Sequence, residues 1–339
     1  MNVSVAPGTG RRLRACEMRT FRARQRRAVP GGHGNEKLLK RFNAGGVSGV
    51  HESMRPLTAL ILPLLVAGGL VAAEPIRHRF VATDESRGQL LLVDQRDPAK
   101  DWTVPLPKNR DVLVDKDTVV VSTADGFREF ALADGSPRRS VTAGKSVTTV
   151  VRNSTGSTFL GSPGRIWEVD GQGTVVRDLP ISGGGMFRIL RLTPAGGFLF
   201  TSGPTTITEL AADGAEMRRF DLGQLDGKTS KPYGAQRLPN GGTMLSTGYG
   251  ASLLELDATG ALVRRIGGKD SVPGVFLNFF ADFTILPDGG VVVANWTGHG
   301  PQDSAKGPQI VQFDRQGALV WSWHDPTRAG SIHGVALLP

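Results

Sequence analysis

The sequence predicts an all-β fold, a six-bladed β-propeller closed by pairing of its N- and C-terminal strands. Short apolar runs alternate with turns rich in Asp and Gly, and the pattern returns about every 40 to 50 residues, as propeller blades do. Helical periodicity is absent after the apolar leader that ends near Ala73. The segment from Asp282 to Trp323 shows the unit in full, with four short strands joined by three turns.

Residues 1–53 form a basic extension that we expect to be disordered or to precede the true start of the protein. They contain eleven Lys or Arg and three Glu, so their net charge of +8 accounts for nearly all of the formal net charge of +9 of the chain. From Glu74 onward, 28 basic residues meet 28 acidic ones. This balance argues against a nucleic-acid-binding surface on the folded part.

Residues 54–73 have the order of a secretory signal peptide. A single Arg follows Met54, an apolar stretch comes next, and small residues end it at Ala73. We therefore expect an exported protein, periplasmic or extracellular, with Met54 as the true start. The alternative is a signal anchor with the basic tail inside the cell, so contact with a membrane is expected only if this leader is retained. Cys16 is the only cysteine, which leaves none for the exported part.

Residues 74–339 supply the six blades. Five complete units can be assigned, and they span residues 111–142, 146–181, 186–222, 233–266 and 280–323. The C-terminal SIHGVALLP matches the first strand of a unit, and the stretch from His78 to Leu106 matches the second, third and fourth strands. Together they complete a sixth blade, whose pairing closes the ring without a long open edge. We expect a monomer.

The recurring turns TPAGG, LPNGG and LPDGG, together with the strand sequence VWSW, resemble those of bacterial six-bladed propellers of the PQQ-like and arylsulfotransferase-like groups. The resemblance covers most of residues 80–339 and implies the propeller fold. Members of these groups include quinoprotein dehydrogenases, sulfotransferases and assembly scaffolds. Arylsulfotransferases use a channel histidine as sulfate acceptor, and His333 occupies the most similar position. The tryptophan docking motifs of the quinoproteins are not found, and the sequence identifies no cofactor.

Binding groups of a propeller accumulate on the rim where the loops between second and third strands meet the loops leading into each first strand. Five of these second-to-third loops are short, whereas residues 295–308 form a long one that carries Trp296 and His299. A loop of this length is either functional or a mobile glycine-rich segment.

Counting back from the first hairpin of each blade places polar residues at one end of the channel. His333, His299 and Asp282 are the candidate catalytic residues, because an imidazole beside a carboxylate can act as a general base. The candidate ligand-binding residues are Arg188, Tyr233, Tyr249, Trp296 and Asn278. The alternative is that these groups only line a water-filled channel. Asp282, with Asp111 and Asn278 nearby, offers too few oxygen ligands for a calcium site, so no metal is expected.

The expected function is binding of a small ligand or a partner protein at the channel rim. The alternative is a hydrolase or group-transfer enzyme, arylsulfotransferase-like or lactonase-like, that uses the channel histidines. Catalysis predicts that His333, His299 and a carboxylate meet around one pocket. Trp321 and Trp323 fall on one face of an outermost strand, where packing between blades is the expected role.

Overall fold

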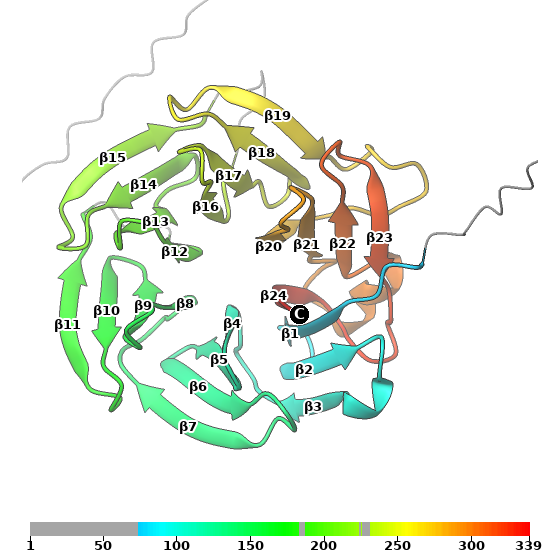
Figure 1. The fold of residues 1–339 in the computed structure, drawn as a ribbon, viewed down its shortest axis with the longest axis horizontal. Coiled ribbons are helices and arrows are strands. Elements are labelled where there is room, and N and C mark those ends of the chain that lie inside the picture. Colours follow the sequence, from blue (N-terminus) through cyan, green and yellow to red (C-terminus); the bar gives the residue numbers. More distant parts are fainter. Residues whose placement is uncertain (1–73, 183–186, 224, 226–230) are drawn as a thin grey trace, which may run out of the picture. The chain divides into compact units, whose positions relative to one another are not determined.

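The computed structural model describes residues 74–182, 187–223, 225 and 231–339, so the expectations for residues 1–73 lie outside the described part. The described residues form six four-stranded antiparallel sheets arranged as blades around one axis (Figure 1). This confirms the predicted six-bladed β-propeller.

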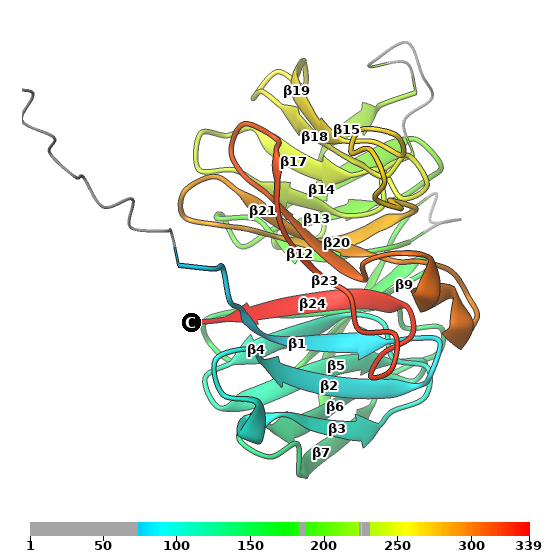
Figure 2. The ribbon, with the colours of Figure 1, turned by 90° about the vertical axis from the view of Figure 1, so that its right-hand side faces the viewer.

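The closing blade combines the two ends of the propeller. Its order is β24 (Ile332–Leu338), β1 (Arg79–Asp84), β2 (Gln89–Asp94) and β3 (Trp102–Pro105). β24 pairs antiparallel with β1, with Arg79 opposite Leu338 and a register shift next to Asp84. The two strands lie side by side in both views (Figures 1 and 2). The predicted closure by one C-terminal and three N-terminal strands is confirmed.

The other five blades follow the chain in order. Blade 1 holds β4 (Val112–Asp115), β5 (Thr118–Thr123), β6 (Gly126–Ala131) and β7 (Pro137–Thr142), and blade 2 holds β8 (Thr149–Arg152), β9 (Thr158–Ser162), β10 (Arg165–Val169) and β11 (Val175–Pro180). Blade 3 holds β12 (Leu190–Leu192), β13 (Phe198–Thr201), β14 (Thr206–Leu210) and β15 (Glu216–Asp221), and blade 4 holds β16 (Ala235–Arg237), β17 (Thr243–Ser246), β18 (Ser252–Leu256) and β19 (Leu262–Gly267). Blade 5 holds β20 (Phe280–Ile285), β21 (Val291–Asn295), β22 (Ile310–Phe313) and β23 (Leu319–Trp323). Two short 3₁₀ helices, η1 (Pro98–Lys100) and η2 (Pro301–Lys306), lie in loops.

The two glycines that recur in the first hairpin turn are each required for a different reason. In LPNGG, Gly241 has φ 83°, a left-handed conformation that disfavours a side chain. A Cβ on the following Gly242 would lie 2.5 Å from the carbonyl oxygen of Leu256 on β18. The first glycine therefore makes the turn, and the second lets the hairpin lie flat against its neighbouring strand.

The core lies between the blades and is built from the inner strands. Trp323 of β23 is buried and meets Phe80 of β1 edge to face, with ring centroids 5.3 Å apart. Trp321 lies 4.6 Å from the ring of His78 and also contacts Phe80. The predicted role of Trp321 and Trp323 in packing one blade against the next is confirmed.

The ring has two faces, which we name by the loops that form them. The hairpin face carries the turns between first and second strands and the end of β24, and the loop face carries the loops between second and third strands (Figure 2). The long loop of residues 295–308, with η2, stands out on the loop face in Figure 2. Among the described residues, no helix has the length and apolar character needed to cross a membrane.

Candidate functional site

A pocket of about 410 Å³ opens on the loop face at the mouth of the channel, and we call it the rim pocket. Six of the eight predicted site residues line it: Arg188, Tyr233, Tyr249, Trp296, His299 and His333. They come from the starts of three blades and from two rim loops, so residues far apart in the sequence converge at one mouth. The other lining residues that matter below are Glu85, Arg110, Lys231 and Phe279.

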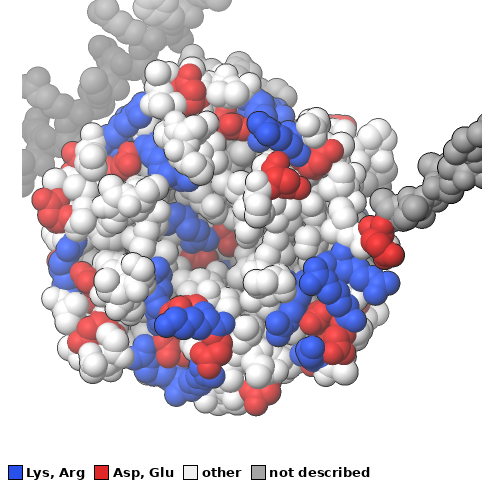
Figure 3. All heavy atoms as spheres, viewed as in Figure 1, with Lys and Arg blue, Asp and Glu red and all other residues white. Residues whose placement is uncertain are grey.

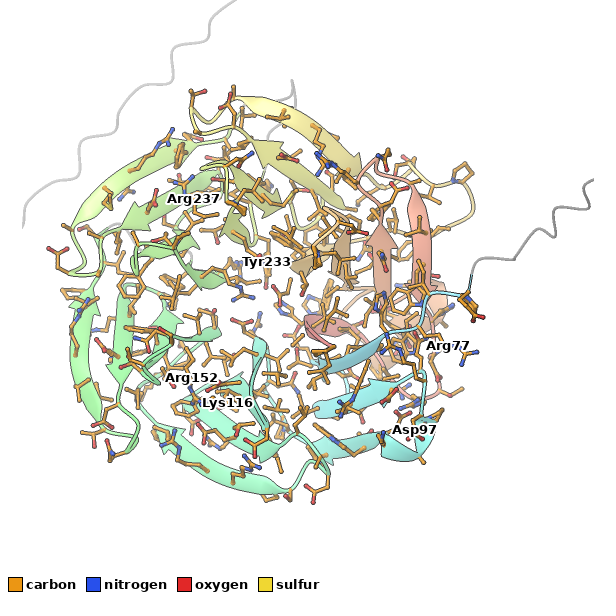
Figure 4. All side chains as sticks on the ribbon, in the orientation of Figure 1. Arg77, Asp97, Lys116, Arg152, Tyr233 and Arg237 are labelled. Atoms are coloured by element: carbon orange, nitrogen blue, oxygen red, sulfur yellow. The ribbon has the colours of Figure 1, made fainter. Side chains whose placement is uncertain are left out.

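The floor of the rim pocket is a pair formed across the channel. The hydroxyl of Tyr233, which precedes β16 and lies close to the ring axis in Figure 4, is 2.5 Å from Nε2 of His333 on β24. Burial raises the pKa of Tyr233 to about 12. Burial, helped by the nearby guanidinium groups of Arg110 and Arg188, lowers the pKa of His333 to about 3. Both side chains are therefore uncharged at neutral pH. We assign the phenol as the donor to Nε2, because a phenol is more acidic than a neutral imidazole.

The backbone around His333 is fixed by close hydrogen bonding. The Oγ1 of Thr83 donates to the carbonyl oxygen of Arg110 at 2.6 Å and accepts from the N–H of Gly334 at 2.8 Å. A Cβ on Gly334 would lie 2.7 Å from that same carbonyl oxygen. Glycine at this position thus lets the loop that carries Arg110 approach β24 and brings Arg110 to the floor of the pocket.

One wall of the rim pocket is aromatic from floor to rim. Phe279 stands at its centre, with ring centroids 4.8 Å from Tyr233, 4.7 Å from Tyr249 and 5.5 Å from Trp296. The imidazole of His299 lies 4.5 Å from the ring of Trp296, at the exposed edge. All these pairs meet edge to face, the arrangement that aromatic rings favour. Tyr233 and Trp296 are buried in this wall, and the accessible part is formed by Tyr249 and the half-buried Phe279.

In the part of the chain that the structure describes, three cationic side chains and one carboxylate line the pocket. Arg110 is paired with Glu85 at 3.0 Å. The guanidinium of Arg188 lies 5.5 Å from the centre of the Tyr233 ring and has no carboxylate partner among the described residues. Lys231 is exposed at the pocket edge. The pocket therefore carries a positive excess that this part of the chain does not neutralise.

The loop of residues 295–308 is held in place by its own hydrogen bonds. The side-chain amide of Asn295 donates to the carbonyl oxygens of Phe276 and Pro308, at 3.0 and 2.7 Å. Asp303 accepts from the N–H of Gly300 at 2.9 Å and pairs with Lys306 at 2.7 Å. The loop is thereby structured, and it presents Trp296 and His299 to the pocket.

Two predicted site residues lie outside the rim pocket. Asn278 lies behind the aromatic wall, where its side-chain amide donates to the carbonyl oxygen of Trp296 at 3.2 Å. Asp282 lines a different recess, of about 470 Å³, on the hairpin face. Figure 3 shows this face, hollowed at its centre, with basic and acidic side chains in the hollow. The structure therefore brings His333 and His299 to one pocket but not the carboxylate of Asp282.

Asp282 belongs instead to a buried ionic group. Arg191 on β12 donates to Asp282 at 2.6 Å and to Asp111 at 2.9 Å. Burial raises the pKa of Asp282 to about 6, although Arg191 opposes this shift. Burial by itself would lower the pKa of Arg191, but the two carboxylates raise it above its usual value. The recess also holds Arg152 and Arg237, which pair with Glu129 and Glu209. Both arginines are labelled in Figure 4.

Four charged or aromatic residues of the rim pocket are not predicted from the sequence: Glu85, Arg110, Lys231 and Phe279. The site residues are predicted by counting back from the Leu-Pro pair of each first hairpin. Blade 1 has no such pair, because its first hairpin reads DKDT around Lys116. Arg110 precedes that blade as Arg188 precedes blade 3, so an alignment of first strands by their apolar pattern could have found it. No group of three or more His, Cys, Asp or Glu suited to a metal ion is present in the part of the chain that the structure describes.

No family model matches the chain, and no curated protein matches its sequence. Solved structures do match the fold. A protein of unknown function from Bacteroides caccae aligns with 22% identity and a TM-score of 0.65, over 78% of this chain and 99% of that one. A streptogramin B lyase aligns with 13% identity and a TM-score of 0.54, over 76% and 83% of the two chains. The WD40 propeller domain of Doa1 aligns with 15% identity and a TM-score of 0.52, over 73% and 79%. At these identities the likeness is one of fold alone.

Proposed function

We propose that this chain is a ligand-binding β-propeller that holds a small organic molecule in the rim pocket. The observation that carries the proposal is the convergence of a continuous aromatic wall, a neutral hydrogen-bonding floor and unpaired cations on one pocket of about 410 Å³. Small-molecule sites combine such apolar walls with a few polar groups that fix orientation.

Binding is favoured over catalysis by the state of His333. Its pKa of about 3 makes it a weak base at neutral pH, and its Nε2 already accepts the Tyr233 proton. The one carboxylate of the pocket, Glu85, is paired with Arg110. A hydrolase or group-transfer enzyme would need a group that activates a nucleophile, and neither His333 nor Glu85 is placed to supply one.

The proposal includes the location of the protein. We propose that the leader of residues 54–73 is removed and that the propeller works as an exported protein of the PQQ-like or arylsulfotransferase-like type, without their catalysis. A small molecule is favoured over a partner protein because the polar and aromatic groups converge inside a pocket.

The test is a binding screen of the full chain with ligand-observed NMR and a library of small aromatic and aliphatic compounds. Hits should lose binding in Tyr249→Ala, because Tyr249 forms the exposed edge of the wall and is 56% exposed, which makes the variant safe for folding. Met217→Ala, also at an exposed apolar side chain but on outer strand β15, should leave binding unchanged. A screen without any Tyr249-dependent hit would contradict the proposal.

A further inference from the structure

We propose that the ligand of the rim pocket is an organic anion with a flat apolar body, whose negative group is bound by Arg188 and Lys231. This inference rests on the proposed function and names the chemical class of the ligand.

Arg188 differs from the arginines of the recess on the opposite face in having no carboxylate partner among the described residues. On the opposite face, the arginines that line the recess are each paired with a carboxylate: Arg152 with Glu129, Arg191 with Asp111 and Asp282, and Arg237 with Glu209. Arg188 is half-buried, and its guanidinium lies 5.5 Å from the centre of the Tyr233 ring. A guanidinium that has lost part of its water without gaining an anion is a ready partner for a carboxylate or phosphate group.

The described residues of the pocket do not neutralise the positive charges of Arg188 and Lys231. Among the described residues, Glu85 is the only carboxylate that lines the pocket, and the 3.0 Å pair with Arg110 occupies it. The floor is uncharged, because His333 is neutral and Tyr233 keeps its proton. The charges of Arg188 and Lys231 therefore act on any ligand in the pocket, attracting an anion and repelling a cation.

The exposed aromatic surface at the pocket mouth indicates the shape of the rest of the ligand. Tyr249 is 56% exposed although its ring edge is packed against Phe279. Trp296 lies beside Phe279 and lines the same pocket. Trp296 itself is buried, so folding leaves the ring of Tyr249 open at the pocket mouth, with the half-buried Phe279 beside it. A flat apolar group would cover this surface and gain from the contact. Aromatic surface next to an unpaired guanidinium thus matches a flat body that carries a negative group.

The test compares three probes of one shape and different charge: 2-naphthoate, 2-naphthamide and 2-naphthylmethylamine. Calorimetric titration of the full chain should give the tightest binding for 2-naphthoate, by about tenfold over the amide, with the amine weakest. Arg188→Gln should lower the affinity for 2-naphthoate about tenfold and leave that for 2-naphthamide nearly unchanged. The matched control is Arg315→Gln, an exposed arginine on the hairpin face without a carboxylate partner among the described residues.

Two failures are distinguishable. If 2-naphthamide or the amine binds as tightly as 2-naphthoate, in a manner that Tyr249→Ala abolishes and Arg188→Gln does not change, the anion inference is overturned while the pocket remains a binding site. If none of the three probes binds and the library screen yields no Tyr249-dependent ligand, the proposed function itself fails.

Discussion

The guanidinium of Arg191 lies 2.6 Å from the carboxylate of Asp282, and this contact joins blade 3 to blade 5 across the channel. The same guanidinium reaches Asp111, directly before blade 1, at 2.9 Å. Asp111 also accepts from Thr149 of blade 2, at 2.5 Å. One arginine side chain therefore ties together strands from several blades at the centre of the ring.

Replacing Arg191 should destabilise the propeller strongly. Arg191→Met leaves the carboxylates of Asp111 and Asp282 buried without their cation, which we expect to lower the free energy of unfolding by about 3 to 5 kcal/mol. Urea denaturation followed by circular dichroism measures the loss. Arg219→Met, which breaks an exposed pair with Glu216, should change the same quantity by less than about 1 kcal/mol. Equal losses in the two variants would show that the buried group contributes no more than a surface pair.

Asp282 should give the propeller an unusual pH dependence. Burial raises its pKa from 3.8 to about 6 in the folded state. Below the lower value the carboxyl is protonated whether the chain is folded or not, and between the two values only the folded chain keeps the proton. The wild type should therefore lose stability relative to Asp282→Asn as the pH rises from about 4 to about 6, and the difference should be constant above about pH 7. Unfolding curves of both proteins across this range test it, and a difference that does not change with pH would refute it.

His333 should act in the opposite direction. Its pKa falls from 6.5 to about 3 on folding, chiefly through burial. Between these two pH values the unfolded chain binds a proton at this imidazole and the folded chain does not. This stabilisation is complete above pH 6.5 and is lost as the pH falls toward 3, by on the order of 3 kcal/mol between pH 6.5 and 4.

His333→Gln should remove this acid-sensitive part of the stability, as measured by unfolding curves at a series of pH values. Tyr233→Phe is the matched control, since it removes the hydroxyl partner and keeps the buried imidazole. Its pH profile should follow that of the wild type. A profile of His333→Gln that is as steep as that of the wild type would contradict the assignment.

Trp323 should be a major contact between blade 5 and the closing blade. It is buried and its ring lies 5.3 Å from that of Phe80. Trp323→Ala should reduce the free energy of unfolding by about 3 to 5 kcal/mol, because it opens a cavity between two blades. Val320→Ala, three residues earlier on the same strand and 41% exposed, should have an effect within about 0.5 kcal/mol. Thermal unfolding of the two variants distinguishes the outcomes.

The fold could be predicted because its signals are local and repeated. The turns with Gly241 and Gly289, and the strand that ends with Trp323, mark the same positions in successive blades. Closure could be predicted because the pieces at the two ends complete one unit. The rim pocket was found in large part for the same reason, since Arg188, Tyr233 and His333 stand at equivalent places before or in first strands.

The positions of Asp282, Arg110, Phe279 and Lys231 could not be predicted, because they lie where the backbone departs from the regular repeat. The register of β20 shifts between Phe280 and Phe283, so counting along the strand does not tell which way Asp282 faces. Arg110 was missed because blade 1 lacks the hairpin marker, and Phe279 because a residue just before a strand shows no periodicity. Lys231 lies in a segment between blades that has no counterpart elsewhere in the repeat.

The pairing of β24 with β1 also sets an order of events during synthesis. These partners are separated by almost the whole length of the propeller, with Arg79 opposite Leu338, and β24 leaves the ribosome after every other described strand. Until it arrives, β1 offers an unpaired inner edge, and the floor of the rim pocket lacks the imidazole of His333. Contacts so distant along the chain form late in folding. The completed ring and the completed pocket should therefore appear in the same step, so that a chain able to bind its ligand is also one that has finished closing.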